Sequence, residues 1–93
     1  MMDLNRKYIR NQDNVAETEF EGATVLLDIE SCKYLKLNLT AKDLWTWSQT
    51  AITIANLVTK LVDKYQIDHQ LAHKDVISWL ESMLDRKLVI AVE

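Results

Sequence analysis

The spacing of apolar residues changes once along this chain, and that change restricts the fold more than any other feature. Residues 15–39 alternate loosely between apolar and polar side chains, which is the two-residue period of a strand with one buried face. From Thr40 to Arg86 the apolar residues recur every three or four positions, as on one face of a helix. The sequence therefore predicts an α+β domain with an N-terminal sheet followed by helices.

Tight turns divide the first half into three short strands. The predicted strands cover residues 15–20, 24–29 and 33–37. Gly22 supplies the positive φ that a tight hairpin turn favours. In the third strand, alternation places Leu35 and Leu37 on one face and Tyr34 and Lys36 on the other. Three strands joined by tight turns predict an antiparallel meander with residues 33–37 at its edge.

Three helices are expected in the second half, followed by a β-prone segment. The predicted helices cover residues 41–49, 54–65 and 70–86, and the β-prone segment covers residues 88–92. Thr40 is expected to begin the first helix, because Asp43 follows three residues later in a near capping box. Thr53 is expected to cap the second helix.

The third helix carries more apolar side chains than a thin helical layer needs. Val76 and Leu80, with their neighbours Ile77 and Leu84, are enough to cover a core. Trp79 and Met83 are four residues apart and widen the apolar strip beyond them. Two interpretations remain open: these side chains complete the core, or they line a binding surface.

Charge and glycine content exclude several classes of function. The formal net charge of −3 argues against a nucleic-acid binder, which usually carries a basic excess. With no proline and only Gly22 as glycine, the chain has no flexible linker and no glycine-rich phosphate loop. Its 93 residues predict a single domain, 1–93, in which residues 1–13 are expected to be flexible.

The lone cysteine and the polar N-terminus predict a cytoplasmic protein. Cys32 has no partner for an internal disulfide, which fits a reducing compartment. The first 14 residues hold no apolar run like that of a signal peptide. No stretch reaches the roughly 20 apolar residues of a membrane span. We therefore expect no membrane association.

No set of residues in the sequence has the composition of a catalytic or metal site. His69 and His73 are four residues apart, but no third ligand accompanies them and His69 is expected in the loop before the third helix. The serines lack the histidine and acid that would activate a nucleophile. We expect no enzyme activity, no metal and no cofactor.

Six segments in order give the chain a resemblance to a known family. They are Val25-Leu-Leu-Asp28, Tyr34-Leu-Lys-Leu-Asn38, Thr40-Ala-Lys-Asp-Leu-Trp45, residues 57–65, Asp75-Val-Ile-Ser-Trp-Leu80 and residues 84–89. Together they resemble the PqqD-like family over about residues 15–89. The chain departs from the family pattern at Ala41 and Lys87, where the family prefers glycine, and at Ser31-Cys32, where a turn glycine is common.

The resemblance implies a recognition element for ribosomally made, modified peptides. Its implied fold is winged-helix-like: a three-stranded antiparallel sheet packed on three helices. Its implied function is to bind the leader segment of a precursor peptide as an added strand on the third strand, against the third helix. A separate leader protease or cyclase would then process the peptide. The chain looks most similar to the free-standing elements of lasso-peptide systems.

The expected peptide-binding residues come from the third strand and the third helix. They are Cys32, Lys33, Tyr34, Leu35, Lys36, Leu37, Val76, Trp79, Leu80 and Met83. The strand would supply main-chain hydrogen bonds and the helix an apolar wall. Lys33 and Lys36 would discourage self-pairing and attract acidic leader residues.

Three other functions remain as alternatives. One is a chaperone in pyrroloquinoline quinone synthesis that serves a radical SAM enzyme. Another is a winged-helix DNA-binding domain, which the acidic residues Asp75, Glu81 and Asp85 of the third helix oppose. The third is a homodimer that uses the same strand edge for self-association.

Overall fold

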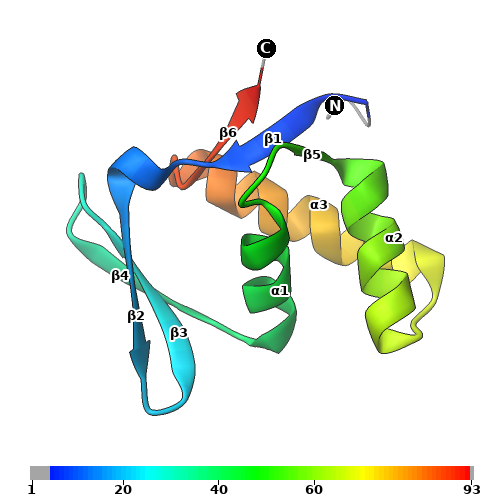
Figure 1. Ribbon diagram of the computed structural model, residues 1–93, viewed down its shortest axis with the longest axis horizontal. Helices are drawn as coiled ribbons and strands as arrows, with labels where there is room; N and C mark the ends of the chain where they lie inside the picture. Colours follow the sequence, from blue (N-terminus) through cyan, green and yellow to red (C-terminus); the bar gives the residue numbers. More distant parts are fainter. Residues whose placement is uncertain (1–4, 93) are drawn as a thin grey trace.

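The computed structural model describes residues 5–92, which form two three-stranded antiparallel sheets and three α-helices (Figure 1). One sheet has the order β2-β3-β4 and consists of β2 (Val15–Phe20), β3 (Ala23–Asp28) and β4 (Lys33–Leu37). These strands confirm the predicted meander to within one residue at each end. In Figure 1 this sheet lies to one side of the helices, with α1 nearest to it.

Two turns with positive φ angles connect these strands. Glu21 and Gly22 have φ angles of 51° and 80°, the combination that a two-residue type I′ hairpin requires. Before β4, Cys32 has a φ of 60°, and its N–H donates to the Asp28 carbonyl at 2.7 Å. A non-glycine residue therefore makes the left-handed turn where the family favours glycine.

A second sheet was not predicted from the sequence. Its central strand is β1 (Lys7–Arg10), which pairs with β5 (Ile52–Thr53) on one side and β6 (Val89–Val92) on the other. The expectation of a single sheet was therefore wrong. β1 and the 3-10 helix η1 (Gln12–Asn14) overlap residues 1–13, whose flexibility stays a prediction. Residues 1–4 lie outside the described residues.

The composition of β1 explains why it was missed. Only Tyr8 of this strand is fully buried, at 4% exposure, so the strand has no alternating pattern long enough to read. Its partners β5 and β6 are distant in the sequence. The β-prone segment at residues 88–92 is confirmed as β6, but a sheet that begins with β1 means that the meander is not the first element of the fold.

The three predicted helices are confirmed, with changes at their starts. They are α1 (Leu39–Trp47), α2 (Ile54–Tyr65) and α3 (His69–Asp85). Asn38 rather than Thr40 caps α1, because its Oδ1 accepts from the N–H of Ala41 at 2.8 Å. Thr53 caps α2 as predicted. His69 is the first residue of α3 instead of a loop residue, and Asp68 caps that helix.

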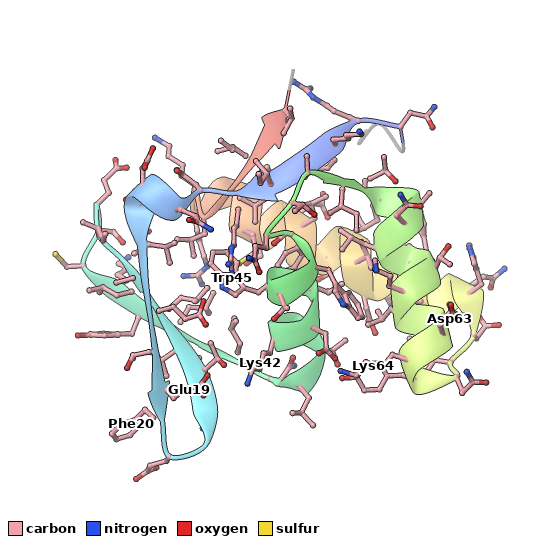
Figure 2. The ribbon with its side chains drawn as sticks, viewed as in Figure 1. Glu19, Phe20, Lys42, Trp45, Asp63 and Lys64 are labelled. Carbon is pink, nitrogen blue, oxygen red and sulfur yellow. The ribbon has the colours of Figure 1, made fainter. Side chains whose placement is uncertain are left out.

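Trp45 of α1 joins both sheets to the helices. Its side chain is 2% exposed, and its Nε1 donates to Glu17 Oε1 of β2 at 2.8 Å. The guanidinium of Arg10, at the end of β1, lies 5.0 Å from the centre of the Trp45 ring and 3.6 Å from Glu17. A second link, between Lys42 and Glu19 at 3.7 Å, lies farther along the hairpin (Figure 2).

The carboxylate of Asp43 connects α1 to α2. Lys64 Nζ donates to Asp43 Oδ1 at 2.8 Å, and the Tyr65 hydroxyl donates to Oδ2. Burial raises the pKa of the Asp43 carboxyl, but hydrogen bonds from Lys64 and Tyr65 outweigh burial and hold that pKa below its ordinary value. Asp43 therefore links two helices instead of completing a capping box with Thr40. No helix in the described part of the chain is long and apolar enough to cross a membrane.

We predict that Asp43→Asn lowers the free energy of unfolding near neutral pH by about 1 kcal/mol, because an amide accepts these hydrogen bonds less strongly. The Asp43 pKa is lower in the folded state, so the stabilisation is present above the unfolded-state pKa of about 3.9 and is lost as pH falls through the folded-state value. The variant should therefore lose less stability than the parent between about pH 4 and pH 2. Urea titrations at each pH measure both effects.

Asp63→Asn is the matched control. It removes the same charge from an exposed position on α2, next to Lys64 (Figure 2). We expect it to change stability by less than about 0.5 kcal/mol. Equal losses from the two substitutions would show that the Asp43 hydrogen bonds do not stabilise the α1–α2 contact.

Candidate peptide-binding groove

The outer side of β4 has no neighbouring strand among the described residues, because β4 pairs only with β3 in its sheet. The register fixes which main-chain groups are free. A two-residue hairpin is closed by a hydrogen-bonded pair, here Phe20 and Ala23. Hydrogen-bonded and non-hydrogen-bonded pairs alternate along two antiparallel strands. Counted from Phe20 and Ala23, Leu26 is not hydrogen-bonded to β2, so its N–H and C=O groups point toward Leu35 of β4.

The same alternation identifies the free donors and acceptors of the edge. Lys33, Leu35 and Leu37 bond to β3, so the N–H and C=O groups of Tyr34 and Lys36 point away from the sheet. Their side chains are also exposed, with Tyr34 at 70%. The edge therefore offers two donors and two acceptors to an added strand.

Two hollows lie along α3. One is beside the β3–β4 turn and Lys33 at the start of β4, and the other is between α3 and the first half of α1, next to Asn38, which follows β4. The larger, which we call the polar hollow, measures about 460 Å³ and is lined by Asp28, Glu30, Ser31, Lys33, Ser82, Asp85, Arg86 and Lys87. The smaller, which we call the Trp79 hollow, measures about 250 Å³ and is lined by Asn38, Thr40, Ala41, Leu44, Asp75, Ser78 and Trp79. Together with the edge of β4 they form the β4–α3 groove.

One stripe of α3 lines both hollows. Its members are Asp75, Ser78, Trp79, Ser82 and Asp85, which recur at the three- and four-residue spacing of one helix face. Of the four α3 residues expected to form the apolar wall, only Trp79 lines a hollow. Val76, Leu80 and Met83 have 0% exposure, because they lie on the adjacent face and fill the core.

Trp79 is the one predicted helix residue that reaches the groove. Its side chain is half-buried and packs against the core. Its Nε1 atom is buried and has no hydrogen-bond partner among the described residues. A buried N–H without an acceptor costs about 1–3 kcal/mol. A hydrogen-bond acceptor from a bound molecule could therefore remove this energetic cost.

The β3–β4 turn that forms the wall of the polar hollow is held by side chains. Asp28 Oδ1 accepts from Asn14 Nδ2 at 3.0 Å and from the N–H of Ser31 at 3.3 Å. Asn14 Oδ1 in turn accepts from the N–H of Glu30 at 3.0 Å. Burial raises the pKa of Asp28, but the hydrogen bonds from Ser31 and Asn14 outweigh it and keep that pKa below its ordinary value.

Charges of both signs line the polar hollow, and most of them have no partner. None of the ion pairs in the described residues involves Lys33, Arg86 or Lys87. The Lys87 backbone has a φ of 60° and closes α3 through its N–H to Leu84 and the N–H of Leu88 to Met83. Lysine thus takes the left-handed position that glycine usually fills after a helix.

The structure brings together part of the predicted site and adds residues that were missed. Residues 32–37 and Trp79 lie along the groove, although Leu37 is buried at 5% exposure. The missed residues are Asp75, Ser78, Ser82, Asp85 and Arg86. Most of these residues lie three or four positions apart along the helix, so the sequence could have placed them on one face with Trp79. They are polar, however, and a search for apolar strips does not detect them.

Metal chemistry has no visible basis in this part of the molecule. Over residues 5–92, no group of three or more His, Cys, Asp or Glu side chains could hold a metal ion. Cys32 is an exposed free thiol in the turn before β4. The groove therefore offers main-chain groups, one indole and unpaired charges, which are means of binding.

Solved structures share this fold. One is TbiB1 in complex with the TbiA(beta) leader peptide, with a TM-score of 0.76, 17% identity, and coverage of 87% of this chain and 93% of that one. Another is lasso peptide synthetase B1 complexed with the leader peptide, with a TM-score of 0.77, 19% identity, and coverage of 89% and 96%. At these identities the likeness concerns the fold. No curated protein matches the chain.

A family model agrees with the resemblance drawn from the sequence. The model described as coenzyme PQQ synthesis protein D (PqqD) matches residues 23–89. The match begins at β3 and ends at the start of β6, so it includes β4, all three helices and both walls of the groove. The family predicted from the sequence is thereby confirmed, and this chain belongs to the PqqD family.

Proposed function

We propose that this chain captures the leader segment of a ribosomally made precursor peptide as a strand added to β4, in the groove against α3. The observation that carries the proposal is an unpaired strand edge that runs between two hollows. Tyr34 and Lys36 would each donate and accept one main-chain hydrogen bond. The chain itself would be non-catalytic and would act by binding.

The four main-chain hydrogen bonds alone would bind the peptide only weakly. Each is worth about 1 kcal/mol net, and four of them are offset by the cost of about 2–5 kcal/mol for ordering a flexible segment. Selective capture therefore needs side chains of the peptide in the hollows. Trp79 is the largest apolar surface available there, and buried aromatic anchors commonly dominate such interfaces.

The structural neighbours support a leader-binding role. The two similar folds are described in complex with leader peptides, one of them as a lasso peptide synthetase component. We infer the same kind of role here, with delivery of the bound precursor to a leader protease or cyclase in a lasso-peptide or related pathway. The family name favours a second candidate, a pyrroloquinoline quinone synthesis chaperone. A precursor gene and a leader protease gene beside the coding sequence would favour the first.

Substitution of Trp79 tests the groove wall. We predict that Trp79→Ala weakens binding of the cognate leader by about 2 kcal/mol, roughly thirtyfold, as for a buried aromatic anchor. Trp79→Phe keeps the ring area but removes the N–H. If the bound peptide gives Nε1 an acceptor, this variant should also weaken binding, by about 1 kcal/mol. Titration calorimetry measures both, and unfolding curves report whether each variant is folded.

Unchanged affinity in a folded Trp79→Ala variant would show that the peptide does not use this wall. Ile90→Ala serves as the control. Ile90 is 44% exposed on β6 and lines neither hollow. We expect its loss to leave leader affinity within about 0.5 kcal/mol of the parent value.

Proline at Lys36 tests strand addition directly. Lys36→Pro removes an outward N–H, whereas proline at Leu35 would break the bond to β3 and the sheet itself. We predict that Lys36→Pro reduces leader affinity by at least tenfold, while Lys36→Ala, which keeps the N–H, reduces it only slightly. Circular dichroism checks the fold.

A leader methylated at the amide nitrogen facing β4 removes a bond without altering the protein. It should reproduce the loss seen with Lys36→Pro. Full affinity of both the proline variant and the methylated leader would rule out main-chain pairing at β4. Sedimentation of the free protein separates peptide capture from self-association through the same edge.

A further inference from the structure

The two hollows differ in the charges and rings that line them, because Lys33, Arg86 and Lys87 line one and Trp79 lines the other. We propose, on the basis of the leader-binding function above, that the groove selects a peptide with an apolar residue followed four positions later by an acidic residue. The apolar side chain enters the Trp79 hollow and the carboxylate enters the polar hollow.

The separation follows from the strand. Lys33 lines the polar hollow at the start of β4, and Asn38 lines the Trp79 hollow just beyond Leu37 at its end. From Lys33 to Leu37 is about 14 Å at roughly 3.4 Å per residue. On the opposite wall, Trp79 and Arg86 are separated by about 10 Å along the axis of α3 at roughly 1.5 Å per residue. An extended peptide covers about 14 Å in four residues and about 10 Å in three at roughly 3.4 Å per residue, and the faces of the sheet decide between the two spacings.

The face of the sheet to which each peptide side chain points determines whether the spacing between the two side chains is odd or even. Side chains directly opposite each other across two strands point to the same face. Peptide residues opposite Lys33, Leu35 and Leu37 therefore point to the face that carries the buried Leu37 and the Lys33 of the polar hollow. Residues opposite Tyr34 and Lys36 point to the exposed face. An odd spacing would send one of the two side chains away from its hollow.

The direction follows from the pairing of the sheet. β2, β3 and β4 are all antiparallel, and an antiparallel addition to β4 continues that arrangement and is slightly the stronger per residue. The N-terminal part of the peptide then lies at the end of β4, beside Trp79. Its C-terminal part lies at the start of β4, beside the polar hollow.

The Trp79 hollow fits an apolar side chain. Ala41, Leu44 and Trp79 provide its apolar lining, and Leu44 is 1% exposed and belongs to the core. Asn38, Thr40, Asp75 and Ser78 contribute polar groups. Asn38 Oδ1 already accepts from the N–H of Ala41 as the cap of α1, and the Asp75 carboxylate disfavours an acidic side chain in this hollow. Burial of a leucine-sized side chain here would replace water next to the indole.

The polar hollow fits a carboxylate better than a cation. Lys33 would be the direct cross-strand neighbour of the incoming side chain, and opposite charges are favourable at such a pair. Lys33, Arg86 and Lys87 take part in no ion pair of the described residues, and Ser82 adds a hydroxyl donor. Of the acids there, Asp28 is already occupied by Asn14 and Ser31, which leaves Glu30 and Asp85 against three unpaired cations.

Synthetic peptides test the spacing and the charge separately. The probes are fluorescent threonine-rich peptides of about twelve residues, long enough to pass both ends of β4. The first carries leucine followed four positions later by glutamate. The others move the glutamate by one position, replace it with glutamine or lysine, or reverse the order of the pair. Fluorescence polarisation gives affinities, and amide NMR shifts of Tyr34 and Lys36 report strand addition.

We expect the first peptide to bind about tenfold more tightly than the shifted, lysine-containing and reversed peptides, as for a charge-assisted contact in a partly enclosed site. Lys33→Glu should invert the preference, so that the lysine peptide binds better than the glutamate peptide. Lys36→Glu is the control, since it makes the same charge change on the opposite face of β4 and should not invert it.

The outcomes separate this inference from the function on which it rests. Peptides that shift the Tyr34 and Lys36 amides but bind equally well at odd and even spacing would overturn the spacing rule alone. Tighter binding of the lysine peptide to the parent protein would overturn the acidic preference alone. If no peptide binds or shifts these amides, strand addition to β4 is wrong and the spacing rule fails with it.

Discussion

The buried indole of Trp45 is the contact that the arrangement of this fold depends on. Trp45 belongs to α1. Its Nε1 donates to Glu17 of β2 and its ring contacts the guanidinium of Arg10 of β1, so one side chain connects both sheets to the helices. The β2-β3-β4 sheet is also held by Leu26 of β3 and Leu37 of β4, whose side chains are buried in the core. These contacts use one face of the sheet, while the outer edge of β4 has no neighbouring strand among the described residues.

Two non-glycine residues with left-handed φ angles lie at the end of the groove that contains the polar hollow. Cys32 precedes β4 and Lys87 follows α3, and both have left-handed φ angles without being glycine. Such positions cost of order 1–3 kcal/mol and persist where the surroundings hold them. Here the surroundings include the hydrogen bond from Asn14 of η1 to Asp28 beside the turn. The two positions therefore carry a cysteine and a lysine side chain where glycine would carry none.

Much of the fold could be predicted from local patterns, whereas the site could be predicted only in part. The meander, the three helices and the Thr53 cap follow from alternation, helical spacing and capping chemistry. β1 could not be found, because its burial comes from pairing with strands distant in the sequence. For α3, periodicity identified an apolar arc but not which side of it faces β4. Val76, Leu80 and Met83 were therefore assigned to the groove although they fill the core.

The sequence by itself determined an α+β order of elements, a strand at residues 33–37 and membership of the PqqD family. These features depend on residues a few positions apart or on the order of motifs along the chain, and both can be read from the sequence without knowledge of long-range contacts. Only the tertiary structure decided that the outer edge of β4 has no neighbouring strand among residues 5–92, and that one stripe of α3 lines both hollows. It also decided that Lys33, Arg86 and Lys87 gather in one hollow and Trp79 lies in the other. Those features depend on how α3 is rotated and where the sheet is anchored, and long-range packing sets both.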